Sequence, residues 1–459
     1  MSGGSGKAPV PNRLREHRLG LGLEQWNVAE RISALTKDGT LLDAHAVSRH
    51  ERGRYKPRRF YRQLYCQVYQ ATEDELWPRP RDGERLDRQQ ADDDPVVAAA
   101  WDRGGTVEAS LALTGSGGLV ERRAFFLLSG TALTAPAHQW LVQEPGRLPA
   151  ALGGDRVTPE LADRLPSMIA ELRRMDDVSG GDVVLSLAER EFSWVASLLD
   201  HASYDAPTAR KLHLALAELG QFTGWVAHDA GLHALAQRYS IAALRAAHTA
   251  GDAALGAYIL GSMAQQATER GLPAEAATLA ETALMGTRGR QTPALLVCMH
   301  RVHAYAKAAL RDGSGCAGAV AKAECWAEQI RPEEEPSRLY WVNRADIAAH
   351  NGRALLRLGR ADEAVRRLAD GVRQLDGSMV RDRQLFLADW AEALARPGRQ
   401  RDLEEAASRG LEAVVLADGL CSTRSTERIR DLCRQLKPHA DVPAVRDFLD
   451  RARDLATTD

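Results

Sequence analysis

The sequence predicts an all-α protein in which a small basic domain of five short helices precedes a long α-solenoid. Apolar residues recur at helical spacing through most of the chain. At 459 residues the chain is too long for one typical hydrophobic core, so two or more domains are expected. From residue 207 onward a pattern of helix pairs also recurs at intervals of roughly forty residues, which is typical of stacked helical repeats.

Charge is distributed unevenly along the chain. The formal net charge is only −2, but residues 7–70 hold 13 Lys and Arg against 6 Asp and Glu, a local balance of +7. The remaining residues therefore sum to −9. A basic segment ahead of an acidic body indicates that only the first part of the chain meets nucleic acid.

Three features of the sequence favour a cytoplasmic protein with no membrane partner. The six cysteines are irregularly spaced, which fits reduced thiols and not a disulfide framework. Residues 1–10 lack the apolar core of a signal peptide, and we expect them to form a flexible leader. No uncharged apolar run approaches the ~20 residues that a membrane-spanning helix needs.

Residues 11–77 carry five helical segments. The first begins at Pro11 and Asn12, a typical start signal. The second, LEQWNVAERISAL, has an apolar stripe that we expect to face the core: Leu23, Trp26, Ala29, Ile32 and Leu35. In the third, DAHAVSRHER, Asp43 is the expected N-cap, and Gly53 follows as the stop. RRFYRQLYCQVYQ forms the fourth, and TEDELW a short fifth.

Particular residues in this segment follow a fixed order. Leu-Arg with a second Arg is followed by a Gln-bearing helix with a buried Ala, and then by Val-Ser, Glu, Gly and Pro. In this chain they are Leu14, Arg15, Arg18, Gln25, Ala29, Val47, Ser48, Glu51, Gly53 and Pro57. The order resembles that of the Xre-type, lambda-repressor-like helix-turn-helix family. The resemblance implies that the third helix, residues 43–52, enters the major groove of DNA.

This resemblance and side-chain chemistry together select candidate DNA contacts. For base edges we expect His45, Ser48 and Arg49, because Arg and Ser can donate to G or T edges. Contacts to phosphate depend mostly on charge and not on the geometry of a base edge. For these contacts we expect Gln25, Arg52, Arg54, Lys56, Arg58 and Arg59. The connection before the third helix is longer than the tight turn of the family, so the exact base-contacting positions stay open. The simpler alternative is a solvated basic helix end, in which Glu51 forms a local ion pair.

Two segments separate this domain from the repeats. Residues 78–95, PRPRDGERLDRQQADDDP, are charged, contain proline and lack apolar periodicity, which predicts a linker. Residues 96–206 are rich in Ala and Leu and predict helices, but their repeat character is unclear.

Residues 207–459 predict a solenoid similar to tetratricopeptide repeats, although the period is longer than the 34 residues of that family. Five segments align at equivalent residue pairs, namely Ala243-Leu244, Ala283-Leu284, Cys325-Trp326, Gly371-Val372 and Gly410-Leu411. Second helices lie between them, for example PALLVCMHRVHAYAKAAL. No single helix pair buries its apolar face alone, so the pairs are expected to stack into a continuous core.

The whole layout resembles a large actinobacterial group of helix-turn-helix regulators with tetratricopeptide-like C-terminal regions. SRHERGRYKPRRFY and GRALLRLGRADEA are similar to segments of that group. The resemblance implies a transcription regulator, often of development or secondary metabolism, that binds double-stranded DNA as a homodimer at a palindromic operator. Peptide-sensing quorum regulators of Gram-positive bacteria are similar in architecture only. They imply that the solenoid senses a signalling peptide, and a small molecule or protein partner is the alternative.

An extended ligand needs polar side chains from several successive helices. Five residues on or beside the inner helices are candidates for such a groove: Asn343, Arg344, Asn351, Arg381 and Arg383. Each also has a simpler interpretation, as a solvent-facing residue or a partner in an inter-helix hydrogen bond. The tryptophans fit the core better than a groove, because large rings usually fill helix crossings: Trp194, Trp225, Trp326, Trp341 and Trp390.

No catalytic or metal site can be assembled from the residue spacing. In CMHRVH, His300 and His303 share a helix face but Cys298 points away, which argues against zinc. LTGSGGL lacks the Lys-Ser/Thr of a phosphate-binding loop, and no Ser/His/Asp arrangement is apparent. We therefore expect a regulator and not an enzyme, with no cofactor and no metal. The alternatives are a protein-interaction scaffold and an antitoxin-like partner of a toxin, with DNA binding secondary in both.

Overall fold

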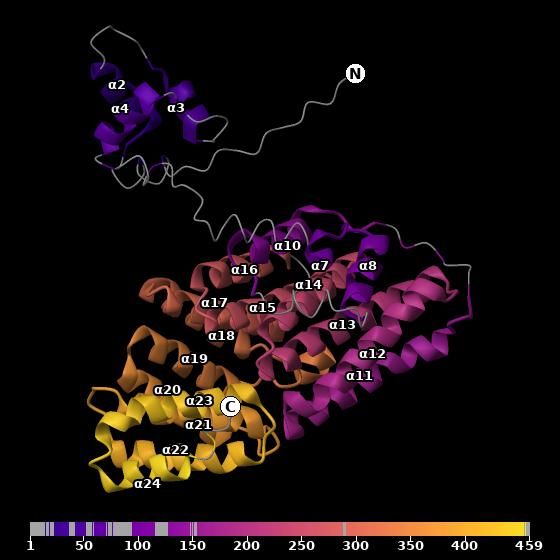
Figure 1. Cartoon of the computed structure of the whole chain (residues 1–459), viewed down its shortest axis with the longest axis vertical. Coiled ribbons are helices and arrows are strands. Elements are labelled where there is room, and N and C mark those ends of the chain that lie inside the picture. Colours follow the sequence, from indigo (N-terminus) through magenta and orange to yellow (C-terminus); the bar gives the residue numbers. More distant parts are fainter. Residues whose placement is uncertain are drawn as a thin grey trace. The chain divides into compact units, whose positions relative to one another are not determined.

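The computed structural model describes Leu14, Arg18, Pro57, Ala71 and Leu76 singly, and residues 23–35, 42–51, 59–69, 94–114, 127–146, 148, 150, 154–287, 291–453 and 455. The chain divides into two compact units, Met1–Leu86 and Asp87–Asp459, which are described separately below. Within the described residues the regular elements are α-helices and short 3-10 helices (Figure 1). One isolated bridge joins Arg156 and Ser203. The all-α prediction is confirmed.

The first unit contains three described helices: α2 (Gln25–Ala34), α3 (Ala44–Glu51) and α4 (Arg59–Tyr69). Helix α2 packs against both of the others. Their shared core consists of Leu14, Val28, Ala29, Ile32, Val47, Leu64, Tyr65, Tyr69 and Leu76. The expected N-cap of α3 is present, because Asp43 Oδ1 accepts a hydrogen bond from the backbone N–H of Ala46 at 2.6 Å.

The predicted apolar stripe of α2 is wrong at two positions. Trp26 is 61% exposed and Leu35 is 45% exposed, whereas Val28, Ala29 and Ile32 are buried. At about 100° per residue, Trp26 lies roughly 110° around the helix from the centre of the buried face. Leu35 is the C-cap of the helix, where the chain already turns away from the core. The buried face is therefore narrower than the stripe.

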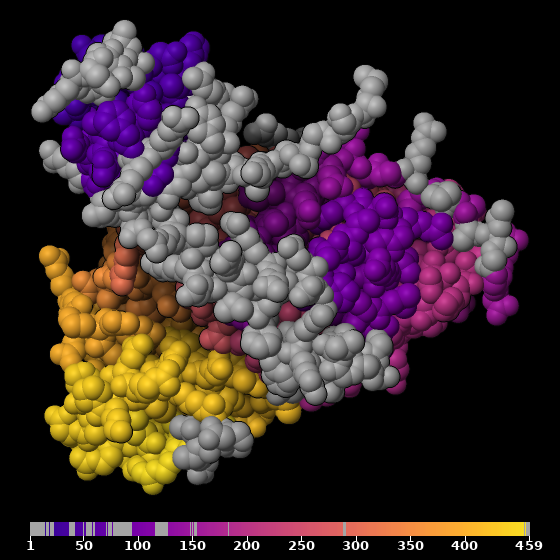
Figure 2. Space-filling view, turned by 45° about the horizontal axis from the view of Figure 1, so that its top comes forward, coloured from indigo at the N-terminus to yellow at the C-terminus, as the bar shows by residue number. Residues whose placement is uncertain are grey.

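The second unit begins with five helices ahead of the regular pairs. They are α7 (Pro95–Ala98), α8 (Arg103–Thr114), α10 (Gly130–Val142), α11 (Pro159–Ser179) and α12 (Gly181–His201). Asp94 caps α7 and forms an ion pair with Arg238 at 2.8 Å. The surface of residues 94–114 is continuous with the helices of the same unit (Figure 2). The last residues of the 78–95 segment thus belong to the packed unit.

Twelve further helices form six consecutive pairs. They are α13 (Ala206–Asp229) with α14 (His233–Thr249), α15 (Ala253–Glu269) with α16 (Pro273–Gly286), α17 (Pro293–Ala309) with α18 (Gly313–Ala327), α19 (Arg344–Leu358) with α20 (Ala361–Gln374), α21 (Val380–Ala395) with α22 (Leu403–Asp418), and α23 (Thr423–Leu436) with α24 (Pro443–Arg451). The short 3-10 helices η1 (Pro332–Glu334) and η2 (Ser337–Leu339) precede α19, and η3 (Lys437–His439) precedes α24. The five aligned sequence segments lie in α14, α16, α18, α20 and α22.

Small residues let neighbouring helices approach closely, both within a pair and between pairs. A Cβ added to Gly371 of α20 would lie 2.7 Å from both the Cβ and the backbone N of Ala349 in α19. A Cβ on Gly410 of α22 would lie 2.8 Å from the ring of Phe448 in α24. Stacked pairs of this kind are consistent with the expected solenoid.

The odd-numbered helices follow one another through the second unit, with each of α13 to α21 contacting the next odd-numbered helix, up to α23. The later helices also return to the earlier ones, because α21 contacts α11 and α23 contacts α13 (Figure 1). A backbone hydrogen bond of 3.2 Å from Cys421 N–H to Ser179 O lies at this contact. The row of helix pairs is therefore closed by contacts between distant parts of the sequence.

Candidate functional site

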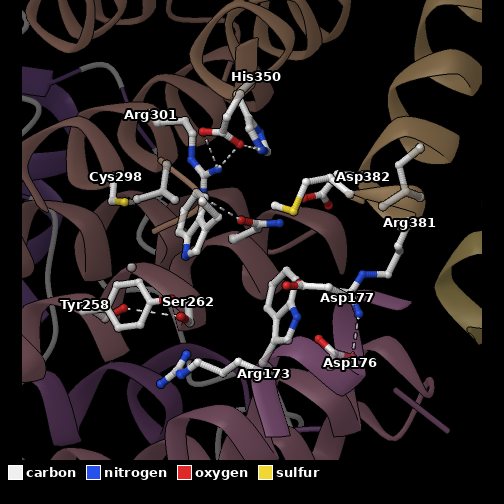
Figure 3. Close-up of a pocket in the computed structure, with 18 of the residues that line it drawn as sticks. Arg173, Asp176, Asp177, Tyr258, Ser262, Cys298, Arg301, His350, Arg381 and Asp382 are labelled. Atoms are coloured by element: carbon white, nitrogen blue, oxygen red, sulfur yellow. Dashed lines mark hydrogen bonds and ion pairs between the residues drawn. The ribbon is translucent and has the colours of Figure 1, made fainter. Parts of the chain in front are cut away.

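A pocket lies on the inner side of the second unit. Its walls come from α11, α13, α15, α17, α19, α21 and α23, together with the segment before α19. It has about 850 Å³ of space outside protein atoms, counting the solvent at its opening. Figure 3 is a close-up of side chains that line it. Six aromatic side chains line it: Phe222, Trp225, Tyr258, Tyr340, Trp341 and Phe386. The odd-numbered helices α13, α15 and α21 position Phe222, Trp225, Tyr258 and Phe386, and the segment before α19 positions Tyr340 and Trp341.

Two of the tryptophans do not behave as simple core residues. Trp225 and Trp341 pack against the core and also line the pocket, so the expectation that they fill helix crossings holds only in part. The guanidinium of Arg424 lies over the ring of Trp225, and that of Arg301 lies over Trp341, each 4.7 Å from the ring centre. Such stacking stabilises planar cations on a ring face.

Buried ion pairs close one side of the pocket. Arg381 of α21 forms ion pairs with Asp176 of α11 at 2.7 Å and with Asp229 of α13 at 3.6 Å. Arg424 of α23 lies 3.2 Å from Asp229. Burial by itself raises the pKa of Asp229, but Arg381 and Arg424 hold that pKa below its usual value. For Asp176 burial outweighs the attraction of Arg381, and its pKa is raised.

A second set of ion pairs continues along the inner side. Arg353 of α19 pairs with Asp389 of α21 at 2.7 Å and with Glu269 of α15 at 3.7 Å. Glu269 is also 2.9 Å from Nε2 of His228. Although burial opposes it, hydrogen bonding from His228 and the charge of Arg424 hold the pKa of Glu269 well below its usual value. These residues line a second, more polar hollow that shares Arg353 and Arg424 with the first.

One buried carboxylate in the pocket serves two partners. Asp346 of α19 accepts from Arg301 of α17 at 3.3 Å and lies 3.2 Å from Nε2 of His350 (Figure 3). Burial raises the pKa of Asp346, yet the positive charge of its two partners leaves it below the usual value. Burial is also the largest cause that lowers the pKa of His350. The ion pair between Arg301 and Asp346 connects α17 to α19.

Two other carboxylates of the lining have different surroundings. Tyr340 donates its hydroxyl hydrogen bond to Asp177 of α11. Burial raises the pKa of Asp177 to about 6, against the hydrogen bond from Tyr340 and the charge of Arg381, which lower it. Asp382 of α21 is one of the neighbouring charges that raise it further. The pocket therefore has an acidic side between α11 and α21.

The structure brings one of the five predicted groove residues, Arg381, into the pocket lining. Asn343 is the N-cap of α19, where its side chain accepts from the N–H of Asp346 at 3.0 Å, and Arg344 is exposed. Asn351 is buried and donates to Glu324 at 3.2 Å, and Arg383 donates to the carbonyl of Val372 at 3.0 Å. The four residues other than Arg381 lie outside the lining of this pocket.

The predicted DNA contacts of the first unit are described only in part. On α3, His45 is exposed and Ser48 is half-buried. Arg49 of α3 and Arg59 of α4 lie within helices, but their side chains are outside the described part of the structure. Four predicted phosphate contacts lie outside the described residues altogether: Arg52, Arg54, Lys56 and Arg58.

A polar network joins three parts of the first unit. Arg18 Nε donates to Glu51 Oε1 at 2.6 Å, and Nη1 of the same guanidinium donates to the carbonyl of Leu23 at 2.9 Å. Gln25, at the start of α2, donates to Glu51 Oε2 at 2.7 Å. Glu51 ends α3, so its carboxylate ties the end of this helix to the start of α2. The ion pair of Glu51 is thus not local, because its partner is 33 residues away.

In comparisons with known proteins, no family model, no curated protein and no solved structure matches the chain. Among the described residues no group of His, Cys, Asp and Glu side chains is arranged to hold a metal ion. The described helices also include none with the length and apolar character required to cross a membrane.

Proposed function

We propose that the protein is a sequence-specific DNA-binding transcription regulator, in which α3 is the recognition helix and the inner pocket of the second unit binds a controlling ligand. The observation that carries the proposal is the network of Arg18, Gln25 and Glu51. All three belong to the residue order that resembles the Xre-type family. A charged pair this buried requires a defined geometry, and here it sets the position of α3 relative to α2.

The position of α3 suits direct contact with bases. Its buried side carries Val47 and His50, and the ring of His50 lies 3.0 Å from the hydroxyl of Tyr65 in α4. The exposed His45 and the half-buried Ser48 are on the rest of its surface. The local charge of +7 over residues 7–70 supplies the attraction to phosphate that non-specific affinity needs.

Control by a ligand follows from the way the second unit is closed. The pocket is lined by α11 and α21, which meet through Arg381 and Asp176. A ligand that contacts both helices stabilises one arrangement of the unit over others, and this shifts the population of the form that binds DNA. We further propose a homodimer, because one small recognition domain buries too little surface for useful specificity.

Selection of DNA from a random library with the full chain, followed by footprinting, tests the proposal. We expect an enriched palindromic sequence and a steep fall of log affinity with log salt concentration. Arg49→Ala should cost about 1–3 kcal/mol and relax selectivity at one base pair. Arg31→Ala, at an exposed position of α2, is the matched control and should leave selectivity unchanged. Equal loss on all sequences for Arg49→Ala would exclude a role in reading bases.

A second candidate function is a protein-interaction scaffold. It is favoured by two exposed aromatic residues of the first unit, Trp26 at 61% and Phe60 at 49%. Large exposed rings of this kind are typical of protein contacts. The salt titration separates the two functions, because a scaffold shows no enriched DNA sequence even at low salt.

A further inference from the structure

The arginines that line the pocket are already paired with carboxylates of the protein. Each of the five forms an ion pair: Arg173 with Glu218 at 3.6 Å, Arg301 with Asp346 at 3.3 Å, Arg353 with Asp389 at 2.7 Å, Arg381 with Asp176 at 2.7 Å, and Arg424 with Asp229 at 3.2 Å. Carboxylates of the protein therefore largely neutralise the positive charge of these arginines. A ligand meets little free positive charge in the lining.

Two carboxylates of the lining have no such pairing. Among the described residues, Asp177 of α11 and Asp382 of α21 form no ion pair with Arg or Lys, although both line the pocket (Figure 3). Arg381 is close enough to Asp177 to influence it, but its ion pairs go to Asp176 and Asp229. The pocket consequently keeps an excess of negative charge on the side where α11 meets α21.

An anionic ligand fits this lining poorly. The Nε atoms of Arg301 and Arg381 lack a hydrogen-bond acceptor, and this alone would favour a carboxylate or phosphate. The same atoms, however, are covered by protein atoms, so an anion cannot reach them while the ion pairs are intact. An incoming anion would also be repelled by Asp177 and Asp382, which form no ion pair among the described residues.

The remaining lining suits a flat apolar body. Tyr258, Met299 and Val302 are buried side chains of the pocket wall, to which Trp341 also belongs. A Cβ on Gly261 would lie 2.5 Å from Met299 Cε, so this wall is closely packed. Arg301 and Arg424 already lie over Trp341 and Trp225, and aromatic faces of this kind attract planar cations.

We propose that the pocket binds an organic cation with a flat apolar body, held at its charged end by Asp177 and Asp382 and at its flat part by the aromatic wall. This inference rests on the proposed function, since it names the chemical class of the controlling ligand. Charge-assisted hydrogen bonds from an amidinium or ammonium group to these carboxylates supply the specificity.

Three probes of the same shape test the charge requirement: benzamidinium, neutral benzamide and anionic benzoate. Each is titrated into the purified full chain without DNA at neutral pH, by calorimetry or ligand-observed NMR. We expect benzamidinium to bind about tenfold more tightly than benzamide, with benzoate the weakest. Equal affinities for the three probes, tighter binding of benzoate, or no binding of benzamidinium at millimolar concentration would overturn the proposal.

Variants locate the binding. Asp177→Asn with Asp382→Asn keeps the shape of both side chains and should abolish the preference for benzamidinium over benzamide. Glu171→Gln, on the same helix α11 but exposed and paired with Arg174, is the matched control and should keep it. A preference that survives the double substitution would place the cation elsewhere and contradict the proposal. The wild-type comparison remains decisive even if the double variant does not fold.

The probe titrations test the ligand class, and the DNA selection tests the transcription regulator, so a negative result in one leaves the other proposal intact. Cation binding without any enriched DNA sequence would keep the pocket and reject the transcription regulator. An enriched operator with no preference for the cation would keep the regulator and reject the ligand class.

Discussion

Arg381 of α21 and Asp176 of α11 form a 2.7 Å ion pair although 205 residues separate them in sequence. Both are almost fully buried, with 5% and 3% of their surface exposed. With Arg424 and Asp229, this pair joins the later helices of the second unit to its earlier ones. The contacts also form one side of the candidate pocket, so stability and binding share the same residues.

Removing Arg381 should destabilise the second unit strongly. In Arg381→Met, Asp176 loses its ion-pair partner and Asp229 loses one of two, and breaking a buried pair costs about 3–5 kcal/mol. Urea denaturation followed by circular dichroism measures the loss. Arg373→Met removes an exposed arginine that pairs with Asp370 on α20 and should cost less than about 1 kcal/mol. Similar losses for both variants would show that burial of the Arg381 pair has little energetic effect.

Asp177 should make stability depend on pH. Its pKa in the folded chain is about 6, above the value near 3.9 expected for an unfolded Asp. The folded state therefore favours the protonated carboxyl of Asp177. The resulting contribution to the free energy of unfolding is complete below about pH 4 and is lost as the pH rises through about 6. The groups facing Asp177 are Asp176, Tyr340, Arg381 and Asp382.

Asp177→Asn should consequently unfold at a higher temperature than the wild type at about pH 8, with the difference disappearing near about pH 4. Thermal unfolding across this range checks the prediction. Glu171→Gln is again the control, because its side chain is exposed. A constant difference between Asp177→Asn and the wild type at every pH would mean that ionisation of Asp177 is not the cause.

Gly371→Ala should destabilise the α19–α20 pair. Helix propensity alone would make this change stabilising by about 1 kcal/mol. The new Cβ, however, would lie 2.7 Å from Ala349 and 2.9 Å from the carbonyl of Ala345, which is backbone and cannot move cheaply. We expect a net loss of about 1–3 kcal/mol in the free energy of unfolding. Gly377→Ala, where the added Cβ has open space, should stay within about 0.5 kcal/mol of the wild type.

Replacing Arg311 with glycine should stabilise the folded protein. It is the one described residue other than glycine with a positive φ, 62°, and it follows α17 at the turn where Gly359, with φ 89°, follows α19. Its Nη1 donates to the carbonyl of Arg357, but the pair is exposed and contributes little. Relief of the backbone strain should stabilise Arg311→Gly by about 1 kcal/mol. Gly359→Ala should shift the unfolding free energy in the opposite direction by a similar amount.

Local pattern was enough to predict the run of helices from α14 to α22. The apolar spacing places α14 to α22 correctly, because contacts between residues three or four apart are written into the sequence itself. The same reasoning misplaced Trp26, since a stripe defined by spacing does not say how wide the buried face is. Asp43 was predicted as a cap because that interaction spans only three residues.

The pocket could not be predicted from the local sequence pattern, because tertiary contacts bring its residues together. Arg381 was among the expected groove residues, but its partner Asp176 lies on a helix without visible repeat character. Trp225 and Trp341 have the size of core residues, and only the tertiary fold shows that both line a pocket. The signal that would have pointed to the site is the run of charged residues on the inner helices, where apolar residues would suffice for packing.

The contact between α23 and α13 gives the last helix pair a structural role beyond that of a terminal cap. In an open stack of repeats, a terminal pair touches only its neighbour and serves as a removable cap. Here α23 supplies Arg424, which sits beside Asp229 on α13 and within 3.9 Å of Glu269 on α15. Truncation before Thr423 would leave these two acids buried with less compensation, so α23 is an integral part of the inner wall and not an end cover.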